Sequence, residues 1–133
     1  MIHLDTHVLV WLAGQEHERI PASARRRLER DDIGISPMAQ LELAFLFESG
    51  KISRTAAHVL AALTPALQVS ISSAPFAAVV GRALELTWTR DPFDRLITAQ
   101  ALADGAALLT ADATIRAHCP SAVWDGDEPA TGS

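Results

Sequence analysis

The sequence predicts an α/β fold, a three-layer α/β/α sandwich whose central sheet is mostly parallel. Short apolar stretches typical of buried strands alternate with helical stretches along the whole chain, which is the pattern of a parallel sheet covered on both faces. The chain has 133 residues and no internal repeat, so one domain with its own core is expected. We place this domain at residues 1–124 and expect the acidic remainder, residues 125–133, to be disordered.

Five strands are expected, each a short apolar run that ends at a polar or turn-forming residue. The run from Leu67 to Ile71 also alternates apolar and polar residues, with Leu67, Val69 and Ile71 on one face. The strands are expected at residues 2–4, 33–35, 67–71 and 107–109, with an edge strand at 122–124.

The helices between these strands are recognised from their end residues. Ser36 followed by Pro37 is a typical helix start with serine as the N-cap, and Gly50 suits the position just beyond the helix end. Asp91 and Pro92 form a second start of the same kind. Helices are expected at residues 8–12, 21–30, 37–48, 54–63, 75–86, 92–104 and 112–118.

Composition and charge argue against several classes of protein. A net charge of −5 is opposite to that of a passive nucleic-acid binder, although an enzyme whose acids hold cations is compatible with it. With 5% aromatic residues, a stacking platform for nucleic acid is not expected to be the main binding device. The single Cys119, the lack of a signal peptide and the lack of a membrane-spanning apolar run favour a cytoplasmic protein without membrane contact.

Four acidic residues fall where a parallel sheet presents functional groups. Asp5 directly follows the first expected strand, at the carboxyl edge where open α/β sheets bind their ligands. Asp94 and Asp112 lie at helix starts expected near that edge, and Glu42 lies beyond the first turn of its helix. The candidate catalytic and metal-binding residues are therefore Asp5, Glu42, Asp94 and Asp112, with Thr6 and Thr110 in supporting positions.

Each acid also has a structural explanation. Asp5 and Asp112 could cap the helices that follow them, and Asp94 could complete a capping box with the N-cap Asp91. Glu42 lies on an apolar helix face, where an ion pair with an arginine is the structural alternative to a metal site.

Electrostatics favours a metal site for the set as a whole. Two carboxylates ~4 Å apart repel by roughly 4 kcal/mol at an effective dielectric constant of about 20, and a divalent cation removes this penalty. Oxygen ligands without cysteine suit Mg²⁺ or Mn²⁺ better than zinc. The spacing of His3 and His7 matches no zinc pattern, so we expect each to orient Asp5 or the first helical turn. The basic face from Arg25 to Arg30 is either a solvated surface or an RNA- or partner-binding patch.

The candidate residues occur in an ordered series of motifs. The series is Ile2-His3-Leu4-Asp5-Thr6-His7, Gln40-Leu41-Glu42-Leu43, Arg90-Asp91-Pro92-Phe93-Asp94-Arg95-Leu96-Ile97 and Leu108-Leu109-Thr110-Ala111-Asp112. In this order and at this chain length it resembles the PIN-domain ribonucleases, and more narrowly the VapC-type toxins of bacterial toxin–antitoxin pairs. The resemblance covers the chain from Met1 to about Trp124.

The resemblance implies a PIN-like fold and a metal-dependent endoribonuclease with Mg²⁺ or Mn²⁺ in an acidic pocket. The four acids match the acidic quartet of the family; Thr110 matches its hydroxyl position, and Thr6 is a weaker match. Asp5 and Asp94 would be the main metal ligands, with Glu42 and Asp112 completing the shell or acting through water. RNA products with 5′-phosphate and 3′-hydroxyl ends are implied as well.

The resemblance further implies a cognate antitoxin and a homodimer. Trp88, Phe76 and the mid-chain helices are candidate contact surfaces of the dimer, with burial in the monomer core as the alternative. Arg90 and Arg95 flank the predicted site and are candidates for contacts with RNA phosphates, with ordinary surface salt bridges as the alternative. A phosphohydrolase of the haloacid-dehalogenase type is one alternative, but His7 stands where that class usually has a second aspartate. A non-catalytic interaction module, whose acids would be caps and an ion pair, is the other.

Overall fold

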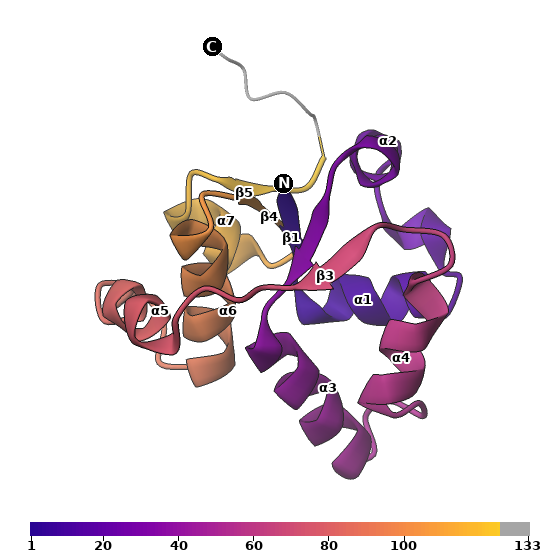
Figure 1. The fold of residues 1–133 in the computed structure, drawn as a ribbon, viewed down its shortest axis with the longest axis horizontal. Coiled ribbons are helices and arrows are strands. Elements are labelled where there is room, and N and C mark those ends of the chain that lie inside the picture. Colours follow the sequence, from indigo (N-terminus) through magenta and orange to yellow (C-terminus); the bar gives the residue numbers. More distant parts are fainter. Residues whose placement is uncertain (126–133) are drawn as a thin grey trace.

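The structure is a computed structural model that describes residues 1–125, in which a five-stranded sheet is combined with seven α-helices (Figure 1). The strands are β1 (Ile2–Leu4), β2 (Ile33–Ile35), β3 (Val69–Ile71), β4 (Ala107–Leu109) and β5 (Ala122–Val123). The helices are α1 (Thr6–Ala13), α2 (Ala22–Arg30), α3 (Pro37–Glu48), α4 (Ala56–Leu63), α5 (Phe76–Ala83), α6 (Pro92–Ala103) and α7 (Ala113–His118), with a 3₁₀ turn at His17–Arg19.

The strands are all parallel and lie in the order β3-β2-β1-β4-β5. The first strand of the chain is therefore the central strand of the sheet. It pairs with β2 through Ile2 opposite Ile33, and with β4 through Leu4 opposite Leu109. Because parallel strands end at the same edge, the residues that follow β1, β4 and β5 become neighbours there.

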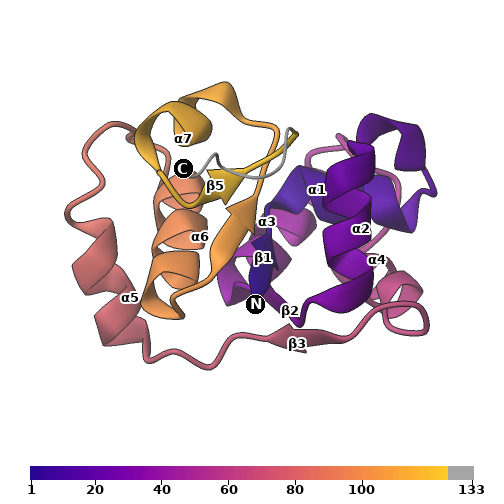
Figure 2. The same cartoon turned by 90° about the horizontal axis from the view of Figure 1, so that it is seen from above.

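Helices cover both faces of the sheet. Figure 2 shows α5, α6 and α7 on one side and α1, α2 and α4 on the other. Helix α3 packs against α1 and α4 and also touches α6 of the opposite layer. This arrangement confirms the predicted α/β/α sandwich, and it brings α3 and α6 together at the carboxyl edge of the sheet.

The core lies on both faces of the three central strands. Their side chains are almost completely buried, as expected for a parallel sheet between two helical layers. The buried apolar residues of these strands are Ile2, Leu4, Ile33, Ile35, Leu108 and Leu109, and the helices contribute Val8, Leu9, Leu43, Ile97 and Ile115.

Several element boundaries differ from those predicted. Pro21 and Pro75 are N-caps rather than first helical residues, and α4 begins after Thr55, whose hydroxyl accepts the amide of His58 at 3.2 Å. Strand β3 is shorter than predicted because the amide of Leu67 still bonds to the carbonyl of Leu63 in the preceding helical turn.

The predicted tail largely falls outside the described residues. Of residues 125–133, only Asp125 is described, and its carboxylate lies 3.6 Å from Arg116. In the described part of the chain, no helix combines the length and the apolar character needed to cross a membrane.

Candidate active site

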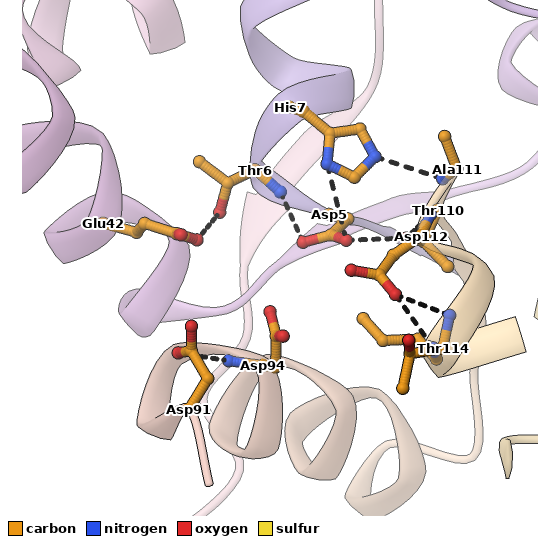
Figure 3. A network of polar contacts seen from close by, with 11 residues as sticks. Asp5, Thr6, His7, Glu42, Asp91, Asp94, Thr110, Ala111, Asp112 and Thr114 are labelled. Carbon is orange, nitrogen blue, oxygen red and sulfur yellow. Dashed lines mark hydrogen bonds and ion pairs between the residues drawn. The ribbon is translucent and has the colours of Figure 1, made fainter. Parts of the chain in front are cut away.

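The four predicted acids converge at the carboxyl edge of the sheet. Asp5 follows β1 and Asp112 lies three residues after β4, while Glu42 extends from α3 and Asp94 from the first turn of α6. Figure 3 shows their carboxylates directed toward a common space from four different elements. Residues separated by more than 100 positions in the sequence are thus brought to one place by the order of the strands.

Asp5 is the most rigidly held member of this group. It is 4% exposed, and its amide donates to the carbonyl of Leu109 at 3.0 Å across the β1–β4 pair. Its Oδ1 accepts the amide of Thr6 at 2.8 Å, and its Oδ2 accepts the hydroxyl of Thr110 at 2.7 Å. Asp5 therefore caps α1, as the structural alternative predicted, while its carboxylate also faces the other acids.

Thr110 links Asp5 to Asp112. Its hydroxyl donates to Asp5 and accepts the amide of Asp112 at 3.0 Å. Oδ1 of Asp112 in turn accepts the amides of Thr114 and Ile115 at 2.8 and 3.0 Å, which caps α7. The cap uses one oxygen of Asp112, so the other can face the site.

Glu42 is joined to Asp5 through the neighbouring threonine. The hydroxyl of Thr6 donates to Oε1 of Glu42 at 2.6 Å, while the amide of Thr6 binds Asp5. Among residues 1–125, Glu42 makes no ion pair with an arginine, so the predicted structural alternative is not observed. Burial raises the pKa of Glu42, the hydrogen bond from Thr6 opposes this, and the charges of Asp5 and Asp91 add to the increase.

Asp94 has the most perturbed acidity of the group. Burial, followed by the charges of Asp91, Asp5, Asp112 and Glu42, raises its pKa from 3.8 to about 7. Because each of these charges contributes, the acids lie close enough to repel one another.

The alternative role of Asp94 in a capping box is not formed. The side chain of Asp91 does cap α6, accepting the amides of Phe93 and Asp94 at 2.8 and 3.3 Å. However, the amide of Asp91 donates to the hydroxyl of Thr89 at 3.2 Å and not to Asp94. The carboxylate of Asp94 is thereby left facing the acidic space.

The donor set fits a hard divalent cation. Clustered carboxylates without cysteine are the ligands that Mg²⁺ and Mn²⁺ favour, and such a cation would relieve both the burial of charge and the repulsion that raise the pKa values of Glu42 and Asp94. Within residues 1–125, no three acidic, histidine or cysteine side chains are placed to hold an ion unaided. Mg²⁺ does not need three such ligands, because it retains several waters and binds only one or two carboxylates directly.

Helices α3 and α6, which carry Glu42 and Asp94, are fixed by a buried hydrogen-bond chain. Ser36 caps α3 by accepting the amide of Met38 at 3.0 Å, and its hydroxyl donates to Oε1 of Gln100 on α6 at 3.2 Å. Nε2 of Gln100 then donates to the hydroxyl of Ser72 at 2.9 Å. These hydrogen bonds fix the positions of α3 and α6 relative to each other below the acidic space.

The two histidines have different roles. Nε2 of His7 accepts the amide of Ala111 at 3.1 Å, so the neutral ring carries its proton on Nδ1, 3.7 Å from Oδ2 of Asp5 (Figure 3). This is the orienting contact expected of His7. The same expectation for His3 is wrong, because its Nε2 forms a hydrogen bond with Asp104 at 2.8 Å. Another neighbour of the His3 ring is Gly34, where a side-chain Cβ would lie only 2.8 Å from the ring.

The arginines near the site are partly engaged within the fold. The guanidinium of Arg95 donates to the carbonyl of Ala83 at 2.9 and 3.2 Å, which satisfies the end of α5. Arg90 is exposed and donates to the carbonyl of Thr87 at 2.9 Å. On the basic face of α2, Arg27 and Arg30 pair with Asp31 at 3.1 and 3.4 Å, which favours a solvated surface there.

Comparison with known proteins identifies the family. The family model of the PIN domain matches residues 2–119 of this sequence. The chain belongs to the PIN-domain family. This PIN domain is 32% identical over 127 residues to ribonuclease VapC22 of Mycobacterium tuberculosis, an alignment that covers 91% of the chain and 96% of that relative.

Solved structures show the same PIN fold. A chain of the Rickettsia felis VapBC2 complex bound to promoter DNA matches with a TM-score of 0.63 and 23% identity, covering 94% of this chain and all of that one. A chain of a Klebsiella pneumoniae toxin–antitoxin complex matches with a TM-score of 0.62 and 19% identity, covering 92% and 96%. The fold and family expected from the motifs are thereby confirmed.

Proposed function

We propose that this PIN domain is a metal-dependent endoribonuclease that hydrolyses RNA phosphodiester bonds. The observation that carries the proposal is the convergence of Asp5, Glu42, Asp94 and Asp112 on one space, with a pKa of about 7 for Asp94. Burial and mutual repulsion of these carboxylates both oppose folding of the metal-free protein, and a bound cation would offset both. Membership of the family that includes ribonuclease VapC22 supports the same conclusion.

In this proposal Asp5 and Asp94 are the main ligands of Mg²⁺ or Mn²⁺, and Glu42 and Asp112 complete the shell directly or through water. When bound, the cation supplies positive charge that activates a water molecule and stabilises the phosphate in the transition state. The protein contributes orientation: Thr110 and Thr6 hold Asp5 and Glu42 in place through bonds of 2.7 and 2.6 Å. RNA products with 5′-phosphate and 3′-hydroxyl ends are expected.

Arg90 remains a candidate for contact with RNA phosphate because it is exposed at the start of α6. Arg95 is a weaker candidate, since both nitrogens that donate to Ala83 would have to leave the end of α5. Replacing each arginine with glutamate and measuring KM for RNA tests the two candidates separately, and the larger increase in KM is expected for Arg90.

The alternatives make different predictions. A haloacid-dehalogenase-type phosphohydrolase would form a covalent phosphate on Asp5, yet the PIN-domain match over residues 2–119 argues against that class. A non-catalytic module would neither bind Mn²⁺ nor be stabilised by it. Calorimetric titration of the metal-free protein with Mn²⁺, together with thermal unfolding, distinguishes a non-catalytic module from the proposed metal-dependent ribonuclease.

The direct test is the Asp5→Asn variant. Asparagine keeps the size of the side chain but removes the charge next to Thr110, so we expect RNA cleavage with Mg²⁺ to fall at least a hundredfold while the protein stays folded. Cleavage at the wild-type rate by a variant free of contaminating nuclease would rule out the assignment.

We also propose that the protein is the toxin of a toxin–antitoxin pair. The Rickettsia felis and Klebsiella pneumoniae matches are both chains of toxin–antitoxin complexes. The antitoxin would lay a segment across the acidic space, with an Arg or Lys in place of the cation. Co-expression with the small proteins encoded nearby tests this: one of them should suppress growth inhibition, and failure of all of them contradicts the proposal.

A homodimer is the remaining part of the proposal. Leu41 and Phe45 on α3 are 55% and 52% exposed, and Phe76 on α5 is 67% exposed, so a second copy of the chain would bury large apolar side chains here. Trp88 is a poorer candidate than expected because its ring stacks on His118 at 5.3 Å. Phe45→Asp should convert a dimer to a monomer in analytical ultracentrifugation, whereas Phe47→Asp, on another side of α3, serves as the control.

A further inference from the structure

A row of aromatic rings begins at the acidic site. The ring of His7, beside Asp5, lies 5.0 Å from the ring of Trp11, and Trp11 lies 6.0 Å from Trp124. Both contacts are tilted, with angles of 53° and 54° between the ring planes. The row therefore extends from the proposed catalytic centre over α1 to the end of β5.

The sheet topology explains why these rings meet. Trp124 directly follows β5, which pairs with β4, so it emerges at the same carboxyl edge as Asp5. The carbonyl of Val123 accepts the amide of Thr110 at 3.1 Å, and the hydroxyl of Thr110 binds Asp5. Val123, the residue before Trp124, is thus linked through Thr110 to the proposed metal ligand Asp5.

The rings are available to a ligand and are accompanied by a cation. Trp11 and Trp124 pack against the core on one side but are only partly buried, and the side chain of His7 is 34% exposed. The guanidinium of Arg19 lies over the Trp11 ring at 5.2 Å and its side chain is 53% exposed, although it also pairs with Glu16 at 3.1 Å. Aromatic faces next to an exposed arginine are the elements with which proteins hold single-stranded nucleotides, by base stacking and phosphate pairing.

We propose that Trp11 and Trp124 form a nucleobase subsite, which stacks an unpaired base of the RNA beside the phosphodiester bond that is cut. The inference rests on the ribonuclease function proposed above. Continuity with Asp5 through His7 favours RNA over a protein segment, because the substrate must extend from the acidic space in some direction. Stacking accepts any base, so the subsite contributes to substrate binding with little sequence preference.

Steady-state cleavage of a short unstructured RNA tests the proposal. Trp124→Ala should raise KM roughly tenfold and change kcat by less than about twofold, because stacking of one base contributes binding on that scale. Trp124→Phe keeps an aromatic face and should restore most of the lost affinity, whereas Trp124→Leu keeps apolar bulk without an aromatic face and should not. Trp88→Phe, at the ring stacked on His118, is the matched control and should leave KM unchanged.

Two results would overturn the subsite. One is a folded Trp124→Ala protein with the wild-type KM; if this variant instead lost inhibition by the antitoxin, the rings would be a protein-docking surface. The other comes from binding without cleavage: in chelator, oligoadenylate should quench the fluorescence of the Trp88→Phe protein, which retains only Trp11 and Trp124. Absence of quenching at saturating RNA contradicts the subsite, whereas quenching without cleavage on adding Mn²⁺ contradicts only the ribonuclease function.

Discussion

The acidity of Asp94 makes the stability of the metal-free protein depend on pH in a defined direction. Its pKa is about 7 in the folded protein and close to 3.8 in the unfolded chain, so the folded protein binds the proton more tightly. Stability contributed by the protonated form is complete below pH 3.8 and is lost as pH rises to about 7. Replacement by asparagine, which is neutral at every pH, should remove this loss.

The size of the effect follows from the change in pKa. The rise from 3.8 to about 7 corresponds to about 4 kcal/mol if it is fully expressed. Asp94 is only partly buried, so solvent screening reduces this to about 1–2 kcal/mol. For a chain of this length, we therefore expect Asp94→Asn to unfold roughly 3–8 °C above the wild type at about pH 8, and at nearly the same temperature at about pH 4.

Thermal unfolding followed by circular dichroism in the presence of a chelator measures this difference. Asp32→Asn is the matched control, because it also removes one negative charge but lies before β2, at the opposite edge of the sheet. It should show no comparable gain. Addition of Mn²⁺ should stabilise the wild type and reverse the advantage of Asp94→Asn. If Asp94→Asn gains nothing over Asp32→Asn at about pH 8, the electrostatic account of the acidic site is incorrect.

Three further substitutions test other parts of the site and its support. Thr110→Val leaves the buried Asp5 carboxylate without its hydroxyl donor, so urea unfolding should show a loss of about 1–3 kcal/mol, and Thr110→Ser should recover most of it. Glu42→Gln removes a carboxylate with a raised pKa, so in chelator at about pH 8 the melting temperature should rise while RNA cleavage falls. Gly34→Ala places a carbon 2.8 Å from the His3 ring and should destabilise the protein by about 1–3 kcal/mol in urea, with no change in Mn²⁺ affinity per folded molecule.

Local signals account for most of what could be predicted from the sequence. The caps at Ser36 and Asp91 depend on adjacent residues, and both helices start where they were expected. The acids that follow strands could also be assigned to one edge, because parallel strands end together. Glu42 was recognised because an acid in the middle of an apolar helix face needs compensation, and the hydroxyl of Thr6 donates one hydrogen bond to it.

The errors arise where non-local geometry decides. His3 was expected to orient Asp5 or the first helical turn, but β1 ends at Leu4 and Asp5 is already the cap of α1, so the alternation of a strand does not extend to Asp5. The ring contact between Trp11 and Trp124 depends on β5 lying beside β4, which no local pattern encodes. The low aromatic content of the whole chain therefore gave no indication that three aromatic rings, those of His7, Trp11 and Trp124, lie together beside the site.

The position of β1 has a consequence for synthesis in the cell. The strand is made first but lies at the centre of the sheet, and its neighbour β4 is made more than 100 residues later. Asp5 obtains its partner Thr110, and the group obtains Asp94 and Asp112, only when the last third of the polypeptide has left the ribosome. A nascent or truncated chain that lacks these residues therefore cannot assemble the acidic group, however early Asp5 is made.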